Sequence, residues 1–216
     1  MKMHQADINL FYSCFYSLGL DSRDKGFAAL AEYVVNTYAE PGRHYHDFGH
    51  IGKMLNVLDQ YLPEADSLDA LRIAILFHDL RQGHKHERES ASMAGILLKP
   101  FNHVLGRMLI NRVAELILDT VHPGNPTTND GQLIHDIDLY GFGQSFEECR
   151  DASRGIRLEY ADMNDEDFYQ AQKGFFEHLL SQDSIYKHPS FAIFEDKARN
   201  NLKKLIKILP ILSIMP

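Results

Sequence analysis

Histidine and aspartate residues gather at three separated places in this sequence of 216 residues. His46 and His50 stand four positions apart, so they share one face if their segment is helical. His78 and Asp79 follow the apolar run LRIAILF, and Asp138 lies within LIHDIDL. Burying such groups among apolar residues is costly unless a partner compensates their charge. Because a divalent ion is such a partner and accepts imidazole and carboxylate ligands, the pattern predicts a metal site.

Further potential ligands surround this first set. The candidates for a second metal or phosphate site are His84, His86, Glu87 and His122. Asp136 lies two residues before Asp138, and residue chemistry does not choose between these two carboxylates. Both therefore remain open as the last ligand of the first metal ion.

A metal site of this composition favours hydrolysis at phosphorus. A bound divalent ion lowers the pKa of its water and neutralises charge on a phosphoryl oxygen. His46 is a candidate proton donor to the leaving oxygen, because the ordinary pKa of histidine is about 6.5. The alternative is that His46 only orients the helix of His50. Arg43 and Arg157 are candidate substrate-binding residues, because a guanidinium group can bind phosphate through two hydrogen bonds.

Helices must position these side chains, because apolar residues recur at helical spacing along most of the chain. The pattern is clear over 21–40, where Pro41 and Gly42 end it, and clearest over 105–120. The full set of predicted helices is 7–18, 21–40, 48–61, 67–81, 88–99, 104–120, 131–142, 146–161, 165–182 and 194–208. Ser145 and Glu148 have the spacing of a capping box. No segment alternates as a strand does, so the predicted fold is all-α.

Composition narrows the function further. The chain has 22 Lys and Arg against 30 Asp and Glu, a net charge of −8, which disfavours binding to duplex nucleic acid. Its two cysteines lack CxxC spacing, which favours a reducing compartment. Without a signal peptide or a long apolar run, we expect a cytoplasmic protein with no membrane partner. Residues 1–216 are predicted to form one domain, ending in an apolar tail over 203–216 that docks on the protein or contacts another subunit.

The motifs also resemble a known family. His50, His78, Asp79 and Asp138 follow the order typical of the HD superfamily of metal-dependent phosphohydrolases. The segments that carry a closer resemblance, to a bacterial subgroup of predicted HD-superfamily phosphohydrolases, are RHYHDFGHI, FHD, ERESA, TVHPGNP, DIDLYGFG, IRLEY and ARNNL. The resemblance covers residues 43–202. It implies an all-helical HD-domain bundle that holds one or two divalent ions, of Mn, Fe, Co, Ni, Zn or Mg.

Individual roles follow from this resemblance. It implies that the first metal is bound by His50, His78, Asp79 and Asp138, with Asp79 also catalytic as a bridge to a second ion. It favours Asp138 over Asp136, because an aspartate followed directly by leucine matches the motif. The segment from Tyr45 to His50 is similar to the YHNxxH motif of cyclic nucleotide phosphodiesterases, in which the first histidine, here His46, is the proton donor. Asp47 and the pair His86-Glu87 depart from the residues expected of these relatives.

The leading hypothesis is a divalent-metal-dependent phosphohydrolase that acts on a nucleotide or another small phosphate ester. A di-iron oxygenase of HD type is an alternative, because ferrous iron accepts the same ligands. A regulatory module that binds metal or nucleotide without turnover is another. The expected partner is a small phosphorylated substrate, and a homo-oligomer stays open.

Overall fold

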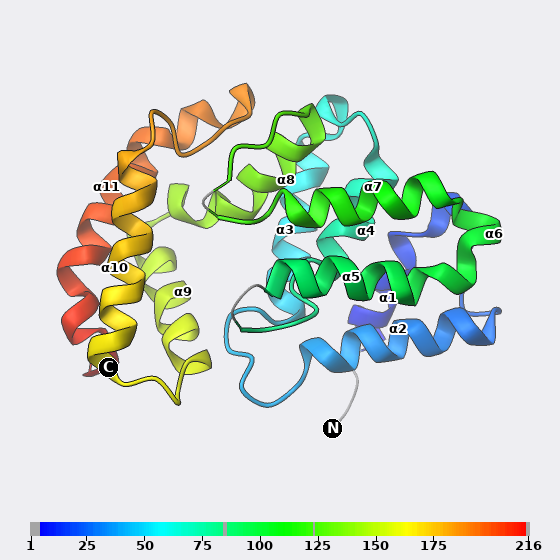
Figure 1. Cartoon of the computed structure of the whole chain (residues 1–216), viewed down its shortest axis with the longest axis horizontal. Helices are drawn as coiled ribbons and strands as arrows, with labels where there is room; N and C mark the ends of the chain where they lie inside the picture. The colour runs from blue at the N-terminus through cyan, green and yellow to red at the C-terminus, as the bar shows by residue number, and fades with distance from the viewer. Residues whose placement is uncertain (1–4, 84–85, 123, 215–216) are drawn as a thin grey trace.

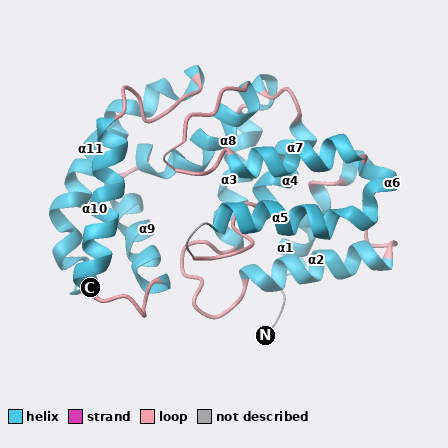
Figure 2. Ribbon diagram, viewed as in Figure 1, coloured by secondary structure: helices cyan, strands magenta, loops and turns pink. Residues whose placement is uncertain are grey.

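The fold is built from helices throughout the described chain (Figure 2), which confirms the predicted all-α class. The computed structural model describes residues 5–83, 86–122 and 124–214. Its α-helices are α1 (Gln5–Ser13), α2 (Lys25–Tyr38), α3 (Phe48–Gln60), α4 (Leu68–Phe77), α5 (His86–Leu98), α6 (Asn102–Leu105), α7 (Arg107–Leu118), α8 (Asn129–Leu139), α9 (Phe146–Glu159), α10 (Asp165–Ser181) and α11 (Glu195–Ile208). Short 3₁₀ helices are η1 (Tyr16–Leu18), η2 (Leu62–Glu64), η3 (Lys99–Phe101), η4 (Tyr140–Gly143), η5 (Pro189–Phe194) and η6 (Leu209–Ile214).

Side chains that cap the first turn explain where several helices begin. The residues whose side chains accept a backbone N–H three positions on are Asp24, Asp47, Thr128, Ser145 and Asn164. Such caps satisfy amide groups that have no partner within the helix. Ser145 and Glu148 form the capping box that their spacing predicts.

Two predicted helices end or break earlier than expected. The helix predicted over 104–120 is divided into α6 and α7 by Gly106, whose φ of 75° and ψ of 144° interrupt the helical path. The helix predicted over 67–81 ends at Phe77, so His78 and Asp79 lie in the turn that follows α4. The turn therefore sets the directions of their side chains, which need not differ by the angle between adjacent residues of a helix.

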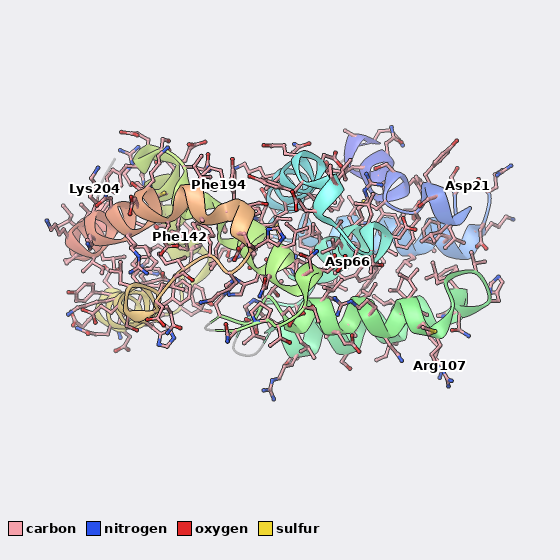
Figure 3. All side chains as sticks on the ribbon, turned by 90° about the horizontal axis from the view of Figure 1, so that it is seen from above. Asp21, Asp66, Arg107, Phe142, Phe194 and Lys204 are labelled. Atoms are coloured by element: carbon pink, nitrogen blue, oxygen red, sulfur yellow. The ribbon has the colours of Figure 1, made fainter. Side chains whose placement is uncertain are left out.

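The helices form two groups with α3 and α8 between them (Figure 1). In one group α5 packs against α7 and α7 packs against α4, while α1 packs against α2. In the other group α11 packs against α9, α10 and η4. The view from above places Lys204 at the end of the second group and Phe142 within that group, both far from Asp21 and Arg107 (Figure 3). Buried apolar side chains from both groups join in one cluster.

Both cysteines lie inside this cluster. Cys14 and Cys149 are each 2% exposed and neither forms a disulfide. Burial raises the pKa of Cys14 to about 12 and that of Cys149 to about 11. Both thiols are therefore protonated at neutral pH.

The beginning of the C-terminal apolar tail docks on the protein. Leu209 is buried in the core, whereas Ile211 is 46% exposed. Across the described chain, no helix combines the length and the apolar character that crossing a bilayer requires.

Candidate metal centre

The predicted metal ligands meet where α3, α4 and α8 approach one another. His50 lies in the first turn of α3, His78 and Asp79 follow α4, and Asp138 lies in the last turn of α8. One ligand atom from each of His50, His78 and Asp138 lies within 4.8 Å of the other two. Ligand atoms around a tetrahedral ion are about 3.4 Å apart, so this group is close to the size that one ion requires.

Asp47 explains how the chain turns His50 into the site. Its carboxylate accepts a hydrogen bond from the backbone N–H of His50 at 3.1 Å and starts α3 at Phe48. Aspartate and asparagine serve equally well in this position. The departure of Asp47 from the asparagine of the related motif therefore preserves the helix start.

The Nε2 atoms of His50 and His78 are buried without a hydrogen-bond partner. Both Nε2 atoms lack a bond of acceptable geometry among the described residues. The Nδ1 of His78 lies 2.9 Å from the carbonyl oxygen of Ile75, which assigns its proton to Nδ1 and leaves a lone pair on Nε2. That Nε2 lies 3.0 Å from Oδ2 of Asp79 and 3.7 Å from Oδ1 of Asp138. A lone pair on Nε2 that faces carboxylate oxygens requires a cation between them, and either a proton or a metal ion can be that cation.

His86 and His122 repeat this arrangement on the other side of the two carboxylates. His86 directs Nδ1 to the carbonyl oxygen of Gly83 at 2.9 Å, and its Nε2 lies 3.3 Å from Oδ1 of Asp79. His122 places Nε2 3.0 Å from Oδ2 of Asp138. Each carboxylate thus has one oxygen toward His78 and the other toward His86 or His122.

Electrostatics at the centre favour cations. Burial alone raises the pKa of Asp79 and Asp138, but the surrounding imidazoles outweigh it and hold both pKa values well below the usual range. Burial lowers the pKa of His78 and His86, yet the carboxylates outweigh this effect, raising the pKa of His78 strongly and that of His86 to about 9. The carboxylates remain charged, and protons or metal ions must compensate them.

His46 lies at the edge of the same centre and is held by Glu159 of α9. The Nδ1 of His46 lies 2.5 Å from Oε2 of Glu159, and Oε1 accepts the backbone N–H groups of residues 44, 45 and 46 at 2.7–2.8 Å. The Nε2 of His46 points to the centre, 4.0 Å from Oδ2 of Asp79. Burial lowers the pKa of His46, but Asp79 and Glu159 outweigh it and raise that pKa. Glu159 was not predicted as a site residue, and its place within the IRLEY segment is its signal in the sequence.

The remaining predicted site residues have other surroundings. Asp136 is fully buried and accepts the backbone N–H groups of Lys187 and His188, so Asp138 is the aspartate beside His50 and His78. Glu87 lies near the centre, with Oε1 3.7 Å from Nε2 of His86. His84 lies outside the described residues.

Neither predicted phosphate-binding arginine directs its donors into the site. Arg43 is buried and donates to the carbonyl oxygens of His46, Asp79 and Leu80. Arg157 donates to the carboxylate of Asp165 and to two carbonyl oxygens at the end of α9. Arg43 thus fastens the turn after α4, and Arg157 fastens the loop between α9 and α10, while their role in substrate binding stays a prediction.

Two cavities meet at the centre and share His46, Asp79, His86 and Tyr160. The larger, of about 620 Å³, has several charged side chains in its lining, including Arg81, Asp162 and Asp167. The smaller, of about 270 Å³, is walled mainly by apolar and aromatic side chains, including Phe142, Ile156, Phe175 and Phe176, with the amide of Gln172 among them. Sequence analysis did not predict these walls, because helices far apart in the chain contribute them.

Compared with known proteins, the chain matches no protein-family model, no curated protein and no solved structure. The geometry of its own residues is therefore the basis for assigning a function.

Proposed function

We propose that this protein is a divalent-metal-dependent phosphohydrolase of HD type that acts on a nucleotide or another small phosphate ester. The observation that carries the proposal is the orientation of the imidazoles of His78, His86 and His122. Each ring has its Nδ1 fixed by a protein partner and turns Nε2 toward Asp79 or Asp138. Partners that fix the outer ring nitrogen are typical of histidine ligands in metal sites.

Among the described residues, His50, His78 and Asp138 form the one group of ligand atoms close enough for a single ion, and His86 and His122 would supply ligands to a second. The first would be held by His50, His78, Asp79 and Asp138, and the second by His86 and His122 together with the outer oxygens of Asp79 and Asp138. When bound, divalent ions polarise a phosphoryl oxygen and lower the pKa of a coordinated water. The described candidate ligands include no cysteine, which fits a catalytic site with oxygen and nitrogen ligands better than a structural zinc site.

His46 is suited to donate the proton that the leaving oxygen needs. Against the opposing effect of burial, Asp79 and Glu159 raise its pKa, which favours the doubly protonated ring, and because Glu159 fixes Nδ1, the proton available to a leaving oxygen is the one on Nε2. That nitrogen faces the centre, and its side chain is 27% exposed along the two cavities. A positioned general acid in contact with both cavities can reach the ester oxygen of a substrate that lies across them.

The smaller cavity favours a nucleoside as the group attached to phosphate. Its described lining contains no lysine or arginine, so it does not suit a second phosphate group. Aromatic rings of Phe142, Phe175 and Phe176 offer apolar faces to a flat base. The amide of Gln172 carries both a donor and an acceptor, which match the edge of a nucleobase.

The test combines metal analysis with phosphate release. We expect protein purified without chelator to contain divalent metal, and to release phosphate from nucleoside monophosphates under Mn, Co, Ni or Mg in the absence of oxygen. Asp79→Ala should lose both properties, because its carboxylate faces both groups of imidazoles. Asp151→Ala, which changes an exposed carboxylate on α9, is the control.

Two results would oppose the proposal. Metal retention by Asp79→Ala at wild-type affinity would reject the site. An iron spectrum together with oxygen consumption, and no phosphate release, would favour the di-iron oxygenase, because its ligand requirements are the same.

A further inference from the structure

A chain of hydrogen bonds extends from the metal centre into the core behind His122. The Nδ1 of His122 lies 3.2 Å from Nε2 of His135, and the Nδ1 of His135 lies 3.0 Å from Oδ1 of Asp136. His135 is 2% exposed and Asp136 is fully buried. These two residues belong to α8 and stand three and two positions before Asp138.

The chain ends in a rigid anchor. The carboxylate of Asp136 accepts the backbone N–H of Lys187 at 2.8 Å and that of His188 at 2.6 Å. Such bonds fix the orientation of the carboxylate. The carboxylate of Asp136 is therefore a fixed acceptor at the core end of this series of hydrogen bonds. The imidazole of His122 is at the other end, beside the metal centre.

The direction of each hydrogen bond follows from this anchor. The Asp136 carboxylate can only accept, so the Nδ1–H of His135 donates to it and the Nε2 of His135 is left as an acceptor. The Nδ1–H of His122 must then donate to His135. These assignments follow from the partners of each ring nitrogen.

These assignments place the proton of a neutral His122 on Nδ1 and leave its Nε2 with a lone pair. In the neutral ring this lone pair faces Oδ2 of Asp138 at a distance of 3.0 Å, and these two acceptors conflict unless a second proton on His122 or a metal ion lies between them. A divalent ion between these two atoms removes the conflict by accepting both as ligands. The alternative hydrogen-bond direction, in which His122 donates Nε2–H to Asp138, would turn the lone pairs of His122 Nδ1 and His135 Nε2 against each other.

We propose that Asp136 and His135 are positioning residues that hold His122 in the orientation and tautomer of a ligand for the second divalent ion. This inference rests on the second metal site of the proposed function. Neither residue touches the ions or the substrate, and both act through His122. A carboxylate that fixes a histidine ligand in this way raises the affinity of the site for metal.

His188 offers a matched control. Like His135 it is a buried histidine beside Asp136, at 4% exposure, but its Nε2 bonds to Asn129 and its Nδ1 accepts the N–H of Ser190. It is not linked to His122. Replacing His188 therefore disturbs the same part of the core without breaking the chain that leads to the metal centre.

The experiment counts metal ions per chain at controlled free Mn²⁺ and measures both binding constants, without substrate. Wild type should bind two ions. His135→Phe should keep the first and bind the second about 10- to 100-fold more weakly, the usual cost of losing a partner that orients a ligand. His135→Gln should recover part of the affinity, because its amide oxygen can accept the N–H of His122. His188→Phe should bind both ions as wild type does.

Several outcomes would overturn the inference. They are wild-type affinity for the second ion in a folded His135→Phe, an equal loss in His188→Phe, and a wild type that binds only one ion. Thermal unfolding of each variant, recorded in parallel, identifies a folded chain. If two ions bind in the expected pattern and wild type releases no phosphate, this inference stands and the proposed function fails.

Discussion

Glu159 joins two distant parts of the chain through one carboxylate. It belongs to α9, yet it accepts three backbone N–H groups from residues 44–46 and holds the ring of His46. Burial raises its pKa, but the hydrogen bond and charge of His46 and the backbone donors outweigh this effect and lower the pKa to about 2. A single side chain thus fixes the loop before α3 and the candidate proton donor together.

The lowered pKa of Glu159 predicts an acid-sensitive contribution to stability. Its ordinary pKa is 4.5, so the contribution is complete above pH 4.5 and is lost as pH falls toward about 2. This shift corresponds to about 3 kcal/mol at 1.36 kcal/mol per pKa unit. Urea unfolding at several pH values should show a steeper loss between pH 5 and 2.5 for wild type than for Glu159→Gln. Glu147→Gln, at an exposed position on α9, should follow wild type, and equal slopes for all three proteins would contradict the assignment.

His46 distinguishes a catalyst from a metal-binding module. His46→Ala should retain metal, because the other imidazoles and both carboxylates remain, and should lose about 10²–10⁴ in kcat on a nucleotide. The loss should be much smaller on a nitrophenyl ester, whose leaving group needs little protonation. Measured kcat values and metal content check this, with the exposed His103→Ala as control. Equal losses on both substrates together with lost metal would make His46 a ligand or an anchor of α3.

At the scale of elements, Gly106 divides the segment 104–120, which the spacing of apolar residues predicts to be one helix. Its φ of 75° and ψ of 144° lie where residues with a Cβ are strained, although a Cβ there would touch nothing within 4 Å. Gly106→Ala should therefore lower the free energy of unfolding by about 1–3 kcal/mol. Gly95→Ala, in the middle of α5 and equally free of contacts, should raise it by about 0.5–1 kcal/mol. Denaturant unfolding checks both, and a change of the same sign would contradict the backbone explanation.

The elements were predictable because local signals determine them. The capping box of Ser145 and Glu148 and the spacing of apolar residues predict most helix boundaries within a few residues. The break at Gly106 was not predicted, because the helical spacing of apolar residues continues across it. At the site, the histidines and aspartates were predictable from their types, whereas Glu159 and the partners of Arg43 were not. These contacts join segments many residues apart, and no local pattern records them.

At the scale of the whole molecule, the metal centre and the smaller cavity are formed by residues from different groups of helices. The described candidate ligands lie between His50 and Asp138, in α3, α5, α8 and the turns beside them. Much of the apolar wall comes from α9 and α10, which belong to the other group of helices in Figure 1. Metal binding and substrate selection should therefore respond to different substitutions.

Gln172 tests this division. Gln172→Leu should raise KM for a nucleoside monophosphate about 10-fold, the value of one or two lost hydrogen bonds, and leave metal content unchanged. KM for ribose 5-phosphate, which has no base, should stay the same. Gln170→Leu, at an exposed position on α10, is the control. A loss of metal in Gln172→Leu, or an equal rise of KM for both substrates, would contradict separate origins for the two functions.

Because both cysteines are buried, thiol-specific probes should not label the native protein. The thiolate is the form that reacts with maleimides, and Cys14 and Cys149 combine 2% exposure with raised pKa values. Cysteines introduced at Met108 and Ile193, which are 88% and 81% exposed, would therefore take up a pair of fluorophores without removal of the native residues. Energy transfer between α7 and η5 would then report in real time whether the two groups of helices change their separation as ions and nucleotide bind.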